Sequence, residues 1–171
     1  ITFEKMELDP VQILRTIGNC LEKTRMVSNI HETMTEILEE IIKLTDNKWG
    51  FIAEFMIDEK KTPFFRYHAI TGFDQLDKNS KISEFYNEKF KKHQKMDFYN
   101  MDTFHGYLYN KHEDIFICND VQKYMQEFSK KFPDGHPKIE KFMAIPMLYK
   151  KEFIGMIGLA NNIRKYEKKE V

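Results

Sequence analysis

Residue types that often carry chemistry are present in this chain, but not at the spacings that catalysis or metal binding requires. The six histidines form no His-Glu-x-x-His motif, and His112, Glu113 and Asp114 are consecutive, so their side chains are expected to diverge. Cys118 lies within an apolar run, whereas a reactive thiol needs an exposed, electropositive setting. Neither a Gly-x-Ser-x-Gly motif nor a glycine-rich phosphate loop occurs. The sequence therefore predicts binding rather than catalysis, with no metal site and no catalytic residue.

The segment between residues 98 and 109 is rich in aromatic side chains that suit ligand binding. Its rings stand at spacings too irregular for a single helix, and they belong to Phe98, Tyr99, Phe104, Tyr107 and Tyr109. Laid over a sheet, such a segment forms a lid whose rings can stack on a flat ligand. The alternative is that these rings complete a second layer of the core. The residues alone leave both interpretations open.

Polar residues interrupt two runs that otherwise resemble buried strands. Glu54 stands in the apolar run 49–58, and Arg66 and His68 stand in the aromatic run 63–73. A polar group on a buried face needs a partner, which can be another side chain, a water molecule or a ligand. We expect a pair between Glu54 and either Arg66 or His68, with contact to a ligand as the alternative.

Two helices are predicted ahead of these strands. Asp9 and Pro10 supply a capping side chain and a first-turn residue for a helix over 8–26. Asn29 supplies the cap of a second helix over 29–45. The apolar residues of this second helix recur at helical spacing, namely Ile30, Met34, Ile37, Leu38, Ile41 and Leu44. This stripe predicts core packing, whereas the first helix is a candidate for packing on a partner chain.

The remaining elements complete a pattern in which strands and helices are mixed. A turn over 58–63 links the two strands. The elements expected after it are a helix over 83–94, a short strand ending at Asp120, a helix over 121–132, a turn over 133–135, a hairpin over 136–162 and the start of a C-terminal helix over 163–171. This order predicts one α+β domain over residues 1–171, built on an antiparallel sheet.

Composition and charge exclude several classes of function. The chain has 27 basic and 27 acidic residues, so it lacks the basic footprint that nucleic-acid binding requires. No run approaches the ~20 apolar residues of a membrane span, and no signal peptide opens the chain. Its two cysteines form no paired framework, which favours a reducing compartment. We expect a cytoplasmic segment of a larger multidomain protein, without nucleic-acid or membrane contacts.

The closing part of the chain carries a recognisable pattern. Its features are Gly135-His136-Pro137, the pair Ile145-Pro146, Gly155 and Gly158, and the ending Leu159-Ala160-Asn161, preceded by a short strand that ends on Asn119-Asp120. This pattern resembles a GAF domain, in particular the GAF domains of bacterial sensor histidine kinases and related signalling proteins of two-component systems. The resemblance extends over nearly the whole chain and is strongest over residues 101–162.

The resemblance implies a fold and a site. The fold is an antiparallel sheet of about six strands, with helices on one face and loops and short helices covering a ligand pocket on the other. The terminal helices of the family often continue into a dimer bundle, which implies a homodimer here. Because an aromatic lid would then face a sheet with unexplained polar residues, we expect Phe98, Phe104, Asn119, Asp120 and Phe142 to line the pocket, with Glu54 and His68 as possible polar contacts.

Departures from the family pattern leave the ligand and any cofactor unknown. Asn162 stands where cyclic-nucleotide-binding members carry a lysine, and neither Cys20 nor Cys118 has the setting of a bilin attachment site. We therefore expect a sensory or regulatory module, without catalysis, that binds a small molecule, mediates dimerisation, or does both. One alternative is a purely structural dimerisation domain with a self-filled pocket. The other is an enzyme that resembles the free methionine sulfoxide reductases.

Overall fold

The computed structural model describes residues 9–25, 29–72, 81–86, 88, 90, 96–111, 115–127, 132 and 136–167. Its centre is a six-stranded sheet in the order β3-β2-β1-β6-β5-β4, and every neighbouring pair is antiparallel. The strands are β1 (Trp49–Ile57), β2 (Pro63–Ile70), β3 (Met96–Phe98), β4 (Phe116–Cys118), β5 (Phe142–Tyr149) and β6 (Glu152–Ala160). The predicted α+β fold with an antiparallel sheet is confirmed.

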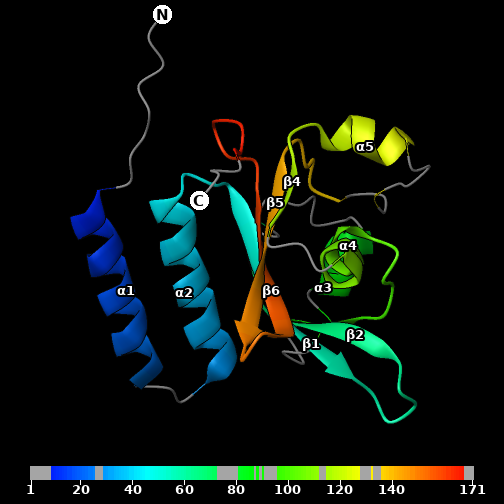
Figure 1. Ribbon diagram of the computed structural model, residues 1–171, viewed down its shortest axis with the longest axis horizontal. Coiled ribbons are helices and arrows are strands. Elements are labelled where there is room, and N and C mark those ends of the chain that lie inside the picture. The colour runs from blue at the N-terminus through cyan, green and yellow to red at the C-terminus, as the bar shows by residue number, and fades with distance from the viewer. Residues whose placement is uncertain are drawn as a thin grey trace, which may run out of the picture.

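Helices cover both faces of this sheet (Figure 1). The helices α1 (Pro10–Arg25) and α2 (Ile30–Leu44) lie side by side on one face, with α2 between α1 and the strands. The shorter helices α3 (Lys81–Tyr86), α4 (Phe104–Lys111) and α5 (Val121–Glu127) lie on the other side. No helix among the described residues is long and apolar enough to cross a membrane.

Local sequence signals place the starts of three helices. The side chain of Asp9 accepts a hydrogen bond of 3.0 Å from the Val11 amide, and Asn29 accepts one of 3.0 Å from the His31 amide. Asp120 accepts one of 3.0 Å from the Lys123 amide at the start of α5. Each of these bonds satisfies a backbone donor that the first turn of a helix leaves unpaired.

Two hydrophobic clusters hold the layers together, one on each face of the sheet. On the side of α1 and α2, Leu38 of α2 is fully buried against the strands, together with Ile52, Ala69 and Leu159. The larger cluster lies on the opposite face and is dominated by aromatic rings from the strands of the sheet and from α4. Gly158 is required between these layers, because a Cβ there would lie 2.2 Å from the Phe51 ring.

The structure differs from the predicted elements in two places. The aromatic segment 96–111 contains a strand, β3, and a helix, α4, neither of which was predicted. The predicted C-terminal helix is wrong for residues 163–167, which are not helical because hydrogen bonds to other parts of the chain hold this segment. Residues 168–171, the turn over 133–135 and parts of the helices expected over 83–94 and 121–132 lie outside the described residues.

Helix α1 exposes an apolar face on the outside of the domain. Its contacts with the domain are mainly with α2 and include an ion pair of 3.3 Å between Lys23 Nζ and Glu36 Oε2. Four apolar side chains on the outer side stay at least half exposed: Val11 (58%), Leu14 (69%), Ile17 (50%) and Leu21 (58%). We call this set the α1 stripe.

Candidate functional site

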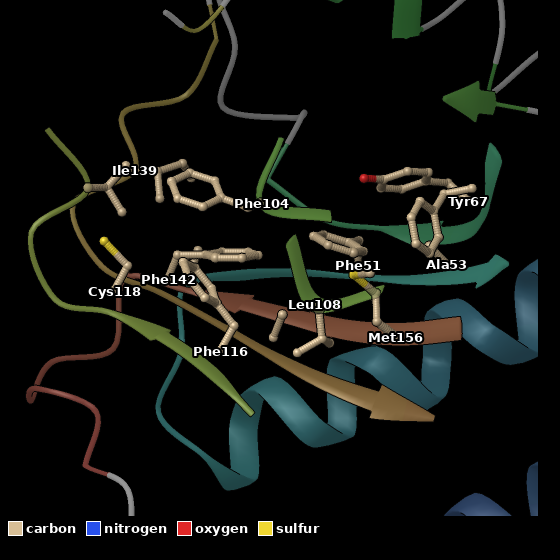
Figure 2. Packing of buried hydrophobic residues seen from close by; sticks show 14 of the residues in the cluster. Phe51, Ala53, Tyr67, Phe104, Leu108, Phe116, Cys118, Ile139, Phe142 and Met156 are labelled. Carbon is tan, nitrogen blue, oxygen red and sulfur yellow. The ribbon is translucent and has the colours of Figure 1, made fainter. Parts of the chain in front are cut away.

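A run of aromatic rings crosses the sheet on the side away from α1 and α2. Phe98 of β3 lies 5.0 Å from Tyr67 of β2, and Tyr67 lies 4.9 Å from Phe51 of β1, between ring centroids. Phe51 lies 6.2 Å from Phe142 of β5, and Phe142 lies 5.2 Å from Phe104 of α4. Figure 2 shows Phe104, Phe142, Phe51 and Tyr67 following one another above the strands. These rings form a continuous aromatic layer.

The aromatic layer continues beyond Phe104 toward α5. The Phe104 ring lies 4.9 Å from Tyr124 and 6.5 Å from Phe132, and Phe132 stacks on His136 at 4.4 Å. Burial lowers the pKa of His136, whose Nδ1 lies 2.8 Å from the Pro137 carbonyl oxygen. The neutral imidazole is therefore favoured, and it acts as one more ring of this layer.

The rings of the aromatic layer pack closely against one another. Phe104 is 8% exposed and Phe142 is 6% exposed, and each contacts several other rings. Three of the residues implied at a pocket, Phe98, Phe104 and Phe142, therefore belong to one cluster. In the described residues these rings contact one another. This arrangement agrees with the interpretation of the aromatic segment as a second layer of the core.

Glu54 and His68 lie on the opposite face of the sheet. His68 Nε2 is 2.8 Å from Glu54 Oε2, and the His68 ring is 5.4 Å from the ring of His31 on α2. Glu54 shares its face with Ile52, which packs under α2, because alternate residues of a strand point the same way. The expected internal pair is thus Glu54 with His68. Arg66 instead bonds Asp97 through both Nε and Nη2, at 2.8 and 2.9 Å.

The two polar pairs differ in burial, so they are expected to contribute differently to the free energy of unfolding. Glu54 is half exposed, so Glu54→Gln is expected to lower the free energy of unfolding by less than about 1 kcal/mol. Arg66→Ala is expected to cost about 2 kcal/mol, because it leaves the Asp97 carboxylate, with 15% of its side chain exposed, without its bidentate partner. Urea denaturation of both variants checks the order, and equal losses would contradict it.

Asn119 and Asp120 have structural partners at the end of β4. Asn119 Nδ2 donates to the Tyr166 carbonyl oxygen at 2.9 Å, and its Oδ1 accepts from the Tyr166 amide at 2.8 Å. Asp120 caps α5, as described above. Asn119 therefore holds the C-terminal segment in the way that a neighbouring strand would, with a donor and an acceptor on one residue.

Further residues, which the sequence pattern did not indicate, complete this C-terminal attachment. Lys141 Nζ donates to the carbonyl oxygens of Asn162, Ile163 and Arg164, at 2.6, 3.1 and 3.1 Å. The Tyr166 hydroxyl donates to Asn47 Oδ1, and both side chains are buried. Burial raises the pKa of Tyr166 to about 12. The only signal in the sequence was an apolar ring inside a charged tail.

Tyr166→Phe is expected to lower the free energy of unfolding by about 1–2 kcal/mol, because the buried Asn47 amide oxygen loses its donor. The pH dependence follows from the raised pKa of Tyr166. The folded state favours the neutral phenol, so this stabilisation is complete below pH 10 and is lost as the pH rises from 10 to about 12. Between pH 8 and pH 11, the free energy of unfolding measured by denaturation is expected to fall less for Tyr166→Phe than for the unmodified chain. An equal fall in both would contradict the role given to this hydroxyl.

The structure therefore divides the seven predicted site residues among three places. Phe98, Phe104 and Phe142 lie in the aromatic layer, Glu54 and His68 pair on the side of α1 and α2, and Asn119 and Asp120 hold a terminal segment and a helix. Contact of any of them with a ligand stays a prediction.

Two buried polar atoms lack a hydrogen-bond partner among the described residues. They are Nε1 of Trp49, at the start of β1, and Nδ1 of His68. Trp49 packs against the aromatic layer, so its indole N–H is an unpaired donor at the edge of this layer. Burial raises the pKa of the Cys118 thiol, which favours its unreactive form. No cluster of three or more His, Cys, Asp or Glu side chains suited to a metal ion occurs in the described ranges.

Several solved structures with the same architecture are GAF domains. The GAF domain of an Acinetobacter phosphoenolpyruvate-protein phosphotransferase has a TM-score of 0.62 at 13% identity, over 95% of this chain and 83% of that chain. The corresponding domain from Coxiella burnetii has a TM-score of 0.64 at 11% identity, over 92% and 83%. The nlh2 GAF domain of A. aeolicus, in an inactive state, has a TM-score of 0.53 at 11% identity, over 92% and 82%. At these identities the likeness establishes the fold.

The sequence itself establishes the family. The profile of the GAF domain matches residues 27–171, which is most of the chain, and the chain belongs to the GAF domain family. No curated protein matches the sequence significantly. GAF domains are in general regulatory or sensory modules of signalling proteins. Helix α1 precedes the residues that the profile matches.

Proposed function

We propose that this GAF domain is a regulatory module, without catalysis of its own, that associates as a homodimer through α1. The observation that carries the proposal is the α1 stripe, whose four apolar side chains recur at helical spacing and remain at least half exposed. An exposed apolar row on one helix is typical of a face that packs on another helix.

Association through α1 would link the domain to its neighbours in a signalling protein. A change in the packing of α2 on the sheet would reach α1 through their shared contact, which includes the ion pair between Lys23 and Glu36. A population shift between two arrangements of these helices is the physical form that such regulation takes. Light scattering coupled to size-exclusion chromatography tests the association. A mass near twice 20.6 kDa is expected, and a constant 20.6 kDa over a hundredfold range of concentration would contradict it.

A second candidate function is the binding of a small molecule at the edge of the aromatic layer. The unpaired Trp49 indole N–H favours it, because a buried donor gains free energy when an acceptor of a ligand reaches it. Rings of the layer would then stack on a flat ligand.

The tryptophan emission reports on this second candidate directly, because Trp49 is the one tryptophan of the sequence. The chain is titrated with cyclic GMP, cyclic AMP and haem. A compound that binds is expected to shift the Trp49 emission and to raise the melting temperature. The shift should weaken in Phe104→Ala, whereas Tyr149→Ala, at an exposed ring, serves as the control. Unchanged emission and melting temperature for all three would exclude these ligand classes.

A further inference from the structure

A glycine stands in the middle of the α1 stripe. Gly18 lies one turn after Leu14 and just under one turn before Leu21, so all three share the outer face of the helix. A Cβ at Gly18 would find no heavy atom within 4 Å. Glycine inside a helix costs about 1 kcal/mol relative to alanine, and nothing within the described domain requires it here.

A crossing helix would explain this glycine. Small residues let the backbones of two helices approach closely, with larger apolar side chains on either side filling the interface. The residues around Gly18 match that arrangement, because Leu14 and Leu21 flank it along the axis and Ile17 lies beside it. The α1 stripe therefore leaves room at Gly18 for the close approach of one other helix.

The charged residues beside the α1 stripe indicate whether the second helix runs parallel or antiparallel to α1. Arg15 and Glu22 are both exposed, lie on the same flank of the stripe, and have no ion-pair partner among the described residues. They are seven residues apart, which is about 10.5 Å along the axis. An antiparallel copy of α1 that crosses at Gly18 brings Arg15 within about 1.5 Å, along the axis, of the level of Glu22 on the other chain. A parallel copy places the two arginines at one level on opposite flanks, and no pair forms.

We infer that two copies of the chain pack their α1 helices antiparallel, crossing at Gly18, with two symmetric pairs between Arg15 and Glu22. This inference rests on the association proposed above and adds its geometry. The interface is isologous, because each patch meets its own copy, and it closes as a dimer. Leu14 of each chain then faces Leu21 of the other across the central glycines.

Disulfide trapping distinguishes this geometry from a parallel one. In a Cys20→Ser background, Leu14→Cys and Leu21→Cys are prepared separately, and each is oxidised alone or as an equal mixture with copper phenanthroline. In the antiparallel pair, two copies of the same cysteine are about 9 to 12 Å apart along the axis, beyond the reach of a disulfide. Cysteines at 14 and 21 lie almost opposite each other. The mixture is therefore expected to form several-fold more cross-linked dimer than either variant alone.

The other outcomes are separable. Cross-linking of each variant alone, as efficient as in the mixture, would overturn the antiparallel geometry and leave the proposed association intact. A dimeric mass without any cross-link would place the interface elsewhere and overturn the inference. A monomeric mass of the unmodified chain would overturn the proposed function together with the inference.

Charge reversal adds a measurement that does not depend on cysteine chemistry. Arg15→Glu or Glu22→Arg alone is expected to raise the dimer dissociation constant about tenfold, because two pairs are lost and repulsions replace them. The double variant restores both pairs in the antiparallel arrangement, so its dissociation constant is expected to return to within about twofold of the original. Additive losses in the double variant would overturn the pairing of Arg15 with Glu22.

Discussion

Replacing Leu14 and Leu21 together with glutamate is expected to convert the associated domain into a monomer. The four leucines of a dimer contribute about 1.5 kcal/mol each on burial, or about 6 kcal/mol together, which is roughly a 10⁴-fold change in the dissociation constant. Both leucines are exposed within one chain, at 69% and 58%, so the fold itself loses little. Sedimentation velocity measures the change in mass, and thermal melting followed by circular dichroism checks the fold.

The matched control for this variant is Leu148→Glu. Leu148 is 56% exposed, nearly the same as Leu21, but it lies at the end of β5 and outside the α1 stripe. We expect this variant to associate like the unmodified chain. If Leu148→Glu dissociated the domain as fully as the double variant, the assignment of the interface to α1 would be wrong.

Truncating Phe142 is expected to produce the largest loss of stability among substitutions in the aromatic layer. Its ring contacts Phe51, Phe104 and Phe116 and is 6% exposed, so Phe142→Ala removes a ring from a closely packed core. Substitutions of this kind cost about 3–5 kcal/mol, a large part of the 5–15 kcal/mol that holds a domain folded. Guanidinium denaturation at neutral pH measures the change.

The size of this loss separates a packed layer from an open site. Phe142→Leu keeps most of the volume and is expected to cost about 1–2 kcal/mol. Tyr149→Ala, at a ring that is 61% exposed, is expected to change stability by less than about 0.5 kcal/mol. A loss below 1 kcal/mol for Phe142→Ala would mean that the ring faces an empty space, and the small-molecule function would then gain support.

Much of the fold could be predicted because its signals are local. The caps at Asp9, Asn29 and Asp120 act within three residues of themselves, and the structure places a helix after each. The strand β3 could not be found in this way, because three residues show no alternation. It exists through its pairing with β2, in which Arg66 stands opposite Asp97.

The grouping of the candidate site could not be predicted, for a physical reason. Both faces of β1 are apolar, so alternation shows that Ile52 and Glu54 share a face but not which layer covers it. Glu54 and His68 were therefore grouped with Phe104 and Phe142, which lie on the other face. The place of Asn119 depends on Tyr166, 47 residues later in the chain, and no local pattern encodes such a contact.

Native mass spectrometry of the freshly purified chain, compared with its mass after denaturation, tests the central claim most directly. We expect a species of twice 20.6 kDa for the unmodified chain and of 20.6 kDa for the Leu14→Glu and Leu21→Glu double variant. The same spectrum reports any retained small molecule as an added mass that denaturation removes. A single 20.6 kDa species from the unmodified chain, and the same mass for the control variant Leu148→Glu, would contradict association through α1.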